Sequence, residues 1–201
     1  MIYNLYRIIN FFMNQISRLI LQTISFILFK INKINFKDGL ISNGIPILSI
    51  QGDFRIGTNF QINNTRKDNP IGRSYKCMFI VRKNAQLLIG NNVGMSGTTI
   101  VCQKKITIGN NVKCGGNVCI YDTDFHSLDP FERQDVQNDQ NNMIKKEVTI
   151  EDNAFIGAHS TILKGVYIGQ NSIIGACSVV TKSIPANEVW AGNPAKFIKN
   201  I

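Results

Sequence analysis

Histidine and acidic residues are both scarce in this chain. It contains two histidines, His126 and His159, and its 13 aspartates and glutamates face 22 lysines and arginines. With so few histidines, one chain does not supply the three-histidine zinc site of a metalloenzyme. The formal net charge of +9 suggests an anionic ligand, a nucleic acid or an acidic membrane surface, or only a lysine-rich solvated surface, and composition does not choose among them.

Cysteine pairs of the CxxC type are absent. The five cysteines are odd in number, so no disulfide framework is indicated. We expect them to be small buried side chains of a protein in a reducing compartment, which favours the cytoplasm. Cys114 and Cys177 fall at interior-type positions of the repeat described below, which argues against a catalytic thiol.

A long uninterrupted apolar run is also lacking. Residues 1–34 are rich in Ile, Leu and Phe at helix-compatible spacing, but Arg7, Arg18, Gln22 and Lys30 interrupt them. A bilayer crossing needs about 20 consecutive apolar residues, and a secretory signal needs a basic start and a cleavage site. We therefore expect one or two helices, which either cap an open end of the domain or lie on the inner membrane surface with their basic residues toward the headgroups.

What the sequence does contain is a six-residue repeat. Aliphatic residues recur without a slip at Ile150, Ile156, Ile162, Ile168, Ile174 and Val180. Small or β-branched residues follow four positions after most of these anchors, at Ala154, Ser160, Val166, Ser172 and Ser178. A helix with about 3.6 residues per turn would carry this pattern around all its faces, and a plain strand has a period of about two. The pattern is typical of short strands joined by tight turns, three of which form one triangular coil of a β-solenoid.

Blocks of the same kind occur earlier in the chain. Repeat-like spacing begins at Ile50, and the motif IGNNV starts at both Ile89 and Ile108. From Ile108 to the next anchor there are 42 residues, which is 24 more than one coil of 18. We predict that the excess forms a protruding loop over residues 126–149, and that the polar stretch 63–76 forms another loop. A long polar insertion in so regular a repeat is more often functional than structural.

Together with the run DFHSLDPFERQ at residues 124–134 and AGNPAKFIK at residues 191–199, the repeat resembles the hexapeptide-repeat acyltransferases. The most similar branch holds the maltose and galactoside O-acetyltransferases and the sugar acetyltransferases of polysaccharide gene clusters. The resemblance implies an all-β solenoid, a left-handed parallel β-helix, over residues 35–201, with residues 1–34 as the N-terminal helical segment. It also implies a homotrimer with the active site between subunits, and acetyl-CoA as acyl donor without a metal.

His126 is the candidate catalytic base. Acyl transfer from a thioester to a sugar hydroxyl needs a base near neutral pH, and imidazole suits that task. In the family a histidine followed by Leu-Asp-Pro and an arginine begins the same protruding loop, so the resemblance assigns this role to His126. Ser127 stands where relatives often have proline. His159 is expected on a solvent-facing turn, or as an interface contact near the acyl donor.

Candidates for acceptor binding lie close to His126 in sequence or one coil before it. Asp122 and Asp124 could orient the imidazole, contact the acceptor sugar, or serve as turn-forming carboxylates. Asn92 and Ser96 fall roughly one coil earlier, where we assign them to sugar binding.

The resemblance places coenzyme A along the later coils. It implies backbone contacts at Ala158 and Ala176, further contacts at Thr181 and Lys182, and a basic contact at Lys199 after the G-N-P-A turn. Lysine meets phosphate as a point charge, which suits this assignment.

The sequence thus favours an acetyl-CoA-dependent acetyltransferase that modifies a sugar hydroxyl during surface polysaccharide assembly in a bacterial cytoplasm, with no nucleic acid partner. An N-acetyltransferase acting on an amino sugar and a non-catalytic hexapeptide-repeat scaffold are the alternatives. The match around His126 argues against the scaffold. A solenoid carbonic anhydrase would need a third histidine, and a nucleotidyltransferase would need a further nucleotide-binding domain.

Overall fold

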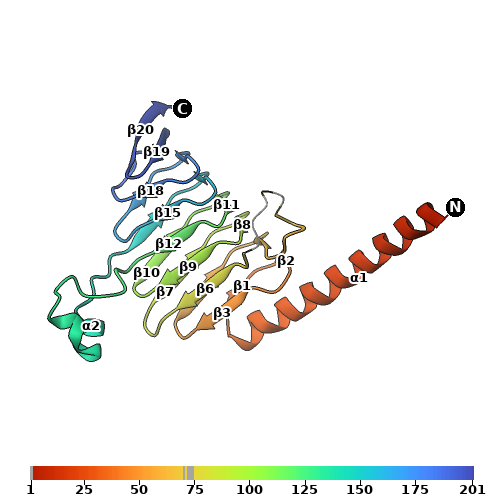
Figure 1. The fold of residues 1–201 in the computed structure, drawn as a ribbon, viewed down its shortest axis with the longest axis horizontal. Coiled ribbons are helices and arrows are strands. Elements are labelled where there is room, and N and C mark those ends of the chain that lie inside the picture. The colour runs from red at the N-terminus through yellow and green to blue at the C-terminus, as the bar shows by residue number, and fades with distance from the viewer. Residues whose placement is uncertain (1, 70, 72–74) are drawn as a thin grey trace.

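The computed structural model describes residues 2–69, 71 and 75–201, which form a triangular left-handed β-helix with one long helix at its N-terminal end (Figure 1). The first face holds β1 (Asn35–Phe36), β4 (Asp53–Ile56), β7 (Gln86–Ile89), β10 (Lys105–Ile108), β13 (Val148–Ile150) and β16 (Tyr167–Ile168). The second face holds β2 (Ile41–Asn43), β5 (Gln61–Asn63), β8 (Gly94–Ser96), β11 (Lys113–Gly116), β14 (Phe155–Ile156), β17 (Ile173–Ile174), β19 (Glu188–Gly192) and β20 (Ala195–Asn200). The third face holds β3 (Ile47–Ile50), β6 (Met78–Val81), β9 (Thr99–Cys102), β12 (Cys119–Tyr121), β15 (Thr161–Ile162) and β18 (Val179–Val180).

The aliphatic anchors of the repeat form the core. Ile89, Ile108 and Ile150 stack in register on the first face, and every anchor from Ile150 to Val180 is buried. Burying one such side chain stabilises the fold by about 1.5–3 kcal/mol, and the contribution repeats in each coil. All neighbouring strands are parallel except β19 and β20, which form an antiparallel hairpin over the last coil. The predicted solenoid is therefore confirmed, and it begins earlier than the spacing indicated, at β1.

One corner of the triangle is made by asparagines in the left-handed region. Their φ angles lie between 55° and 63°, at Asn59, Asn92, Asn111, Asn153, Asn171 and Asn187. Asparagine tolerates this conformation better than most residues. Each side-chain amide also donates to the next one along the solenoid at 2.7–3.0 Å. The corner is thereby both turned and cross-linked from coil to coil.

Helix α1 (Ile2–Ile31) is a single helix whose last part seals the first coil. Phe29 is fully buried there and packs edge-on against Phe36. The Gln22 side chain donates to the carbonyl of Leu40, and the Ser25 hydroxyl donates to the carbonyl of Gly44. These contacts hold the C-terminal part of α1 against β2 and the residues on either side of it.

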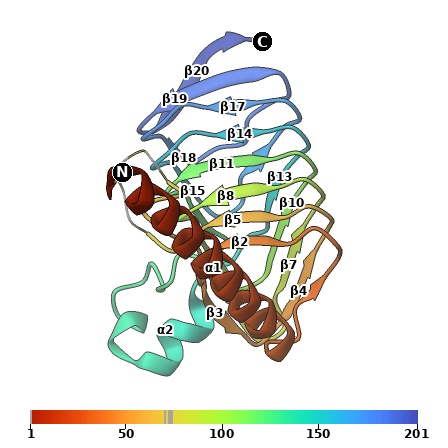
Figure 2. The ribbon, with the colours of Figure 1, turned by 90° about the vertical axis from the view of Figure 1, so that its right-hand side faces the viewer.

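The N-terminal half of α1 leads away from the strands. Figure 1 shows it projecting beyond the solenoid, and Figure 2 shows the second face behind it. Its large apolar side chains are exposed, including Tyr3, Leu5, Tyr6, Ile8, Ile9, Phe11, Phe12, Met13 and Ile16. By length and composition alone, Tyr3–Ile31 could cross a membrane, and only 6% of its most apolar stretch is buried. The polar residues that interrupt residues 1–34 had predicted that no segment there is apolar enough to cross a bilayer.

The insertion that the coil arithmetic predicted over residues 126–149 is confirmed, and the polar stretch 63–76 lies between two strands. The longer one contains a 3-10 turn, η1 (Glu132–Gln134), and helix α2 (Val136–Asn142), and it gives way to β13 at Val148, slightly before the predicted end at residue 149. The stretch 63–76 connects β5 to β6, and its residues 70 and 72–74 lie outside the described residues.

All five cysteines are free, and three of them are buried. Burial raises the pKa of the Cys114 thiol to about 12, which fits its predicted interior position. The interior position predicted for Cys177 is wrong, because this residue turns a corner with φ of 59° and is exposed. A six-residue pattern does not distinguish the last interior position from the corner beside it.

The buried contact of Phe29 generates a stability prediction. Truncating a buried phenylalanine to alanine typically costs about 3–5 kcal/mol, so Phe29→Ala should clearly lower the urea midpoint of unfolding. Phe12→Ala on the projecting half is the matched control, because Phe12 is 59% exposed, and it should leave the midpoint unchanged. Equal midpoints for the two variants would show that α1 does not seal the first coil.

Candidate active site

The long loop is joined to the solenoid by Asp122, which is fully buried just after β12. Its carboxylate accepts hydrogen bonds from the backbone N–H groups of Gln103, Lys104 and Lys105 at 2.7, 2.7 and 2.8 Å. Its carbonyl accepts the N–H of Lys146 at 2.9 Å, on the returning side of the loop. The prediction that Asp122 contacts the acceptor is therefore wrong, since all of its polar atoms are used inside the fold. The turn-forming alternative is the correct one.

Asp124 belongs to the base of the loop as well. Its N–H donates to the carbonyl of Ile144, and Thr123 forms an antiparallel bridge with Lys145. Its carboxylate pairs with Lys164 Nζ at 2.7 Å, on the turn that follows β15. Asp124 thus faces the next coil, and it neither orients His126 nor lines the groove described below.

His126 is instead held by Asp139, a residue of α2. His126 Nδ1 lies 2.7 Å from Oδ2 of Asp139, and the other oxygen of that carboxylate accepts the N–H of Ser127 at 2.7 Å. The imidazole side chain is 68% exposed, whereas that of Asp139 is 12% exposed. A shielded carboxylate therefore presents an accessible imidazole.

Local hydrogen bonds give this part of the loop its shape. Asp135 caps α2 by accepting the N–H of Asn138 at 2.8 Å. Arg133 donates to the carbonyl of Ser127 at 2.7 Å, and the Ser127 hydroxyl bonds to Glu132. The carboxylate on α2 and the imidazole at the start of the loop are thus fixed relative to each other.

The charge state of Asp139 determines which ring nitrogen of His126 is free. The hydrogen bond from His126, followed by the one from the Ser127 N–H, holds the pKa of Asp139 below its ordinary value. The carboxylate is therefore ionised at neutral pH and accepts a hydrogen bond from Nδ1–H of His126. Nε2 then carries the lone pair, and it has no hydrogen-bond partner among the described residues. This is the arrangement that a general base requires.

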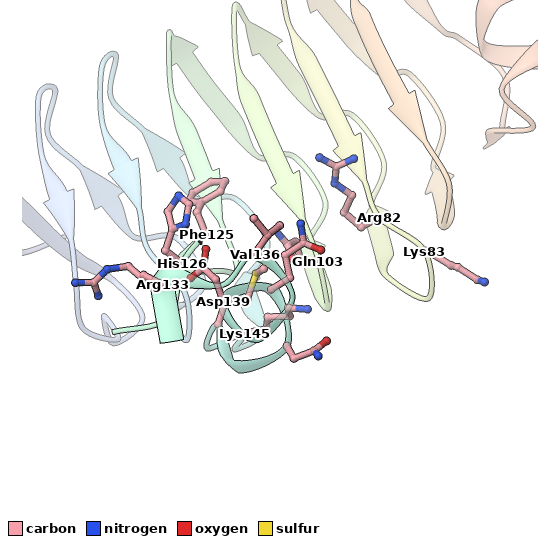
Figure 3. Close-up of a pocket in the computed structure, with 12 residues that line it drawn as sticks. Arg82, Lys83, Gln103, Phe125, His126, Arg133, Val136, Asp139 and Lys145 are labelled. Atoms are coloured by element: carbon pink, nitrogen blue, oxygen red, sulfur yellow. Dashed lines mark hydrogen bonds and ion pairs between the residues drawn. The ribbon is translucent and has the colours of Figure 1, made fainter. Parts of the chain in front are cut away.

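The imidazole stands at the edge of a groove of about 1320 Å³ between the loop and the earlier turns of the solenoid. Figure 3 shows Arg82 and Lys83 on the turn between β6 and β7, across from His126 and Asp139 on the loop. The lining residues are Arg82, Lys83, Gln103, Phe125, His126, Arg133, Val136, Asp139, Gln140, Asn141, Met143 and Lys145.

The residues predicted to bind sugar do not reach this groove. Asn92 is a rung of the asparagine ladder, with φ of 57°. Ser96 lies on the second face, where its hydroxyl accepts the Asn63 amide at 3.0 Å. Within one chain Asn92 and Ser96 lie on a different corner and a different face from His126. Their assignment to sugar binding stays a prediction.

The residues assigned to coenzyme A divide between separate places. Ala158 and Ala176 lie one coil apart at the corner between the second and third faces, and within the described ranges neither backbone N–H has an acceptor. Thr181 and Lys182 are exposed and directly follow β18. They lie on the same corner of the solenoid as the long loop, which protrudes two coils earlier. Lys199 is exposed in β20. None of the five lines the groove beside His126.

His159 lies between Ala158 and the third face, on a turn with φ of 62°. Its Nδ1 is 3.1 Å from the side-chain amide of Asn117, one coil earlier. The ring is half-buried, so it is less open to solvent than we expected.

Sequence reasoning missed Asp139 and the basic side of the groove. Asp139 is 13 residues from His126 inside a polar stretch, and nothing in that stretch distinguishes its carboxylate from the others. Arg82 and Lys83 did carry a signal, because two adjacent cations occupy a turn at the same corner as the loop.

Replacing Asp139 by asparagine tests the assigned tautomer. The Ser127 N–H donates to Oδ1 of Asp139, and this position must remain an acceptor in the variant. Asp139→Asn should therefore keep its oxygen toward Ser127 and direct its NH2 group toward Nδ1 of His126. Nδ1 would then accept, and the proton would move to Nε2. Nitrogen-15 NMR of the imidazole should report this exchange. Asp135→Asn, the same change at the cap of α2, should leave the tautomer as it is, and an unchanged tautomer in both variants would contradict the assigned hydrogen bond.

Comparisons with known proteins place the repeat in a family. The family model described as bacterial transferase hexapeptide (six repeats) matches residues 147–182. Galactoside O-acetyltransferase of Lactococcus lactis is 42% identical over 103 residues, which cover 51% of this chain and 47% of that protein. The chain spans about half the length of the curated relatives it matches.

Solved structures agree with this placement. Galactoside acetyltransferase in complex with coenzyme A is 30% identical, with a TM-score of 0.50 over 83% of this chain and 66% of that chain. A point mutant of AntD, an N-acyltransferase from Bacillus cereus in complex with dTDP-4-amino-4,6-dideoxyglucose and coenzyme A, is 20% identical, with a TM-score of 0.63 over 86% and 87% of the two chains. That second likeness concerns the fold alone. With its six-residue repeats, its left-handed solenoid and these relatives, the chain belongs to the hexapeptide-repeat acyltransferases.

Proposed function

We propose that this protein transfers an acetyl group from acetyl-CoA to a hydroxyl group of a sugar. The observation that carries the proposal is the pair of His126 and Asp139, in which an ionised carboxylate fixes the imidazole and leaves Nε2 free beside a large groove. The family membership and the galactoside acetyltransferase relatives support an acetyl-CoA donor and a sugar acceptor.

The geometry supports a direct transfer. Nε2 of His126 accepts the proton of the acceptor hydroxyl as its oxygen forms a bond to the thioester carbonyl carbon. Backbone N–H donors stabilise the negative charge on the carbonyl oxygen. When the carbon–sulfur bond breaks, the imidazolium returns its proton to the leaving thiolate. Asp139 stabilises the imidazolium between these two proton transfers. An amino group on the acceptor would use the same base, so product analysis decides between ester and amide.

The coenzyme is proposed to bind along the later coils. The free N–H groups of Ala158 and Ala176 offer two hydrogen-bond donors one coil apart. Lys182 and Lys199 are exposed cations that suit the phosphate groups, and Thr181 stands beside the first of them.

A homotrimer would bring these parts together. Within one chain, His126 and the N–H groups of Ala158 and Ala176 occupy different corners of the triangular solenoid. A donor that touches both sets must therefore lie between two copies, which supports an active site at a subunit interface. We place the reaction in surface polysaccharide assembly in a bacterial cytoplasm, the setting that the resemblance implies.

The projecting half of α1 is proposed to lie on an acidic membrane surface. Its large apolar side chains are exposed, whereas Asn4, Arg7, Asn14 and Arg18 recur at helical spacing along one side. The helix is therefore amphipathic, and its apolar face needs a non-aqueous partner. The charged residues of α1 are all cations: Arg7 lies on the projecting half, Arg18 pairs with Asp68 at 2.7 Å, and Lys30 lies over the Phe36 ring in the last turn. This charge suits anionic headgroups and does not suit an acidic protein core.

Removing residues 1–16 tests the membrane proposal. The truncated chain keeps the contacts of Gln22, Ser25 and Phe29 with the first coil, so it should stay folded by circular dichroism. Sedimentation with vesicles that contain phosphatidylglycerol should recover the full chain and lose the truncated one. If the full chain ignores the vesicles and instead forms larger assemblies through α1, the partner of the helix is another copy.

Replacing His126 by alanine tests the proposed reaction. Thiol release from acetyl-CoA in the presence of a panel of sugars measures it, and His126→Ala should lower turnover by about 10²- to 10⁴-fold, the range of a positioned base. Gln137→Ala is the control, because Gln137 is exposed on α2 and does not line the groove. Turnover within a few-fold of the parent for His126→Ala would remove the base from its role.

A further inference from the structure

The groove beside His126 carries an excess of positive charge. Four of its lining side chains are cations: Arg82, Lys83, Arg133 and Lys145. Among the described residues that line it, the only carboxylate is that of Asp139, which is already bound to His126 at 2.7 Å. The groove therefore does not neutralise its own cations.

Neighbouring lysines show that this excess is local. Lys104 and Lys105, on the next turn, lie 3.4 and 3.8 Å from the carboxylate oxygens of Glu147. For the four groove cations, no carboxylate of the described chain comes within ion-pair distance. At this corner the lysines outside the groove are therefore paired with a carboxylate, whereas the cations that line the groove are not.

These cations come from different segments that the fold holds in place. The N–H of Arg82 donates to the carbonyl of Cys102 at 2.9 Å, and the carbonyl of Arg82 accepts the N–H of Ala85 at 3.0 Å. Lys145 is held by its bridge with Thr123 at the base of the loop. In Figure 3, Arg82 and Lys83 stand on the solenoid side of the groove, and Lys145 lies on the side of the loop. A ligand between them meets cations from two directions.

We propose that this groove binds the diphosphate of the acceptor, so that the substrate is a sugar carried on a diphosphate ester. This inference rests on the proposed acetyl transfer and specifies the class of its acceptor. A guanidinium binds phosphate oxygens bidentately, and an ammonium adds a point charge. The groove of about 1320 Å³ is larger than the ~300–1,000 Å³ of an ordinary small-molecule site. It has room for a sugar ring at His126 and for the diphosphate beyond it.

Coenzyme A also carries a diphosphate, but its expected contacts lie elsewhere. The groove faces the turns after β6 and β9, on the side of the loop toward the earlier coils. Ala158, Ala176 and Lys182 belong to the later coils, beyond β13. The loop with His126 stands between these two regions, which is where an acetyl group must pass from donor to acceptor.

Binding of inorganic diphosphate by calorimetry tests the inference without any turnover. Arg82→Gln should weaken this binding by about tenfold or more, the loss expected for a hydrogen bond to a charged group. Lys104→Gln is the matched control, because it removes a cation from the adjacent turn that does not line the groove. It should leave the affinity unchanged, and saturating coenzyme A should not displace the diphosphate.

Three outcomes would overturn the inference. Displacement of diphosphate by coenzyme A would assign the groove to the donor. Equal weakening by Arg82→Gln and Lys104→Gln would reduce the effect to general surface charge. A parent protein that does not bind diphosphate at all would leave the groove without this ligand. Absence of thiol release with every acceptor would instead contradict the proposed acetyl transfer, and would leave the diphosphate measurement valid.

Discussion

The carboxylate of Asp122 is the interaction on which the site depends. It accepts three backbone N–H groups of the turn between β9 and β10, while its own carbonyl holds the returning strand of the loop. A buried carboxylate without these donors would be strongly destabilising. The bonds therefore fix both ends of the loop against the wall that carries Gln103. The loop that presents His126 is in this way attached to a rigid part of the solenoid, which gives the proposed base a defined position.

The solenoid and its insertion could be predicted because their signals are local and repeated. Each coil must bury an aliphatic anchor and turn three corners, so the pattern at Ile150 recurs at Ile168 after one full coil. The same regularity made the insertion measurable as an excess of residues after Ile108. The role expected for His126 rested on the resemblance of the run DFHSLDPFERQ, at the head of this insertion, to the motif of the family. The apolar spacing of α1 predicted a helix but did not show which half packs on the first coil, because both halves are rich in apolar residues.

The partners of His126 could not be predicted, because they depend on the course of the loop in space. Asp122, Asp124 and Asp139 are equivalent by residue type, yet one is buried under a turn, one pairs with Lys164 and one contacts the imidazole. Proximity in sequence favoured the first two, and the formation of α2 favoured the third. The position of Asn92 within the chain could not be predicted for a related reason. An amide that could bind a sugar is also the residue type that best turns this corner, and the ladder of asparagines shows that the second property governs its position.

The net charge of the chain indicates a ligand only when the positions of the charged residues are known. A count of 22 basic against 13 acidic residues is compatible with many ligands. At the corner of the loop, however, Glu147 sits beside Lys104 and Lys105, and Asp139 is committed to His126. The acidic residues nearest the groove are thus occupied, and the positive potential is concentrated beside the imidazole. In a water-accessible groove such charges are screened by salt over about 8–10 Å, so they act mainly on a group that comes into contact with them. Charge placed there selects an acceptor more effectively than the same charge spread over the surface.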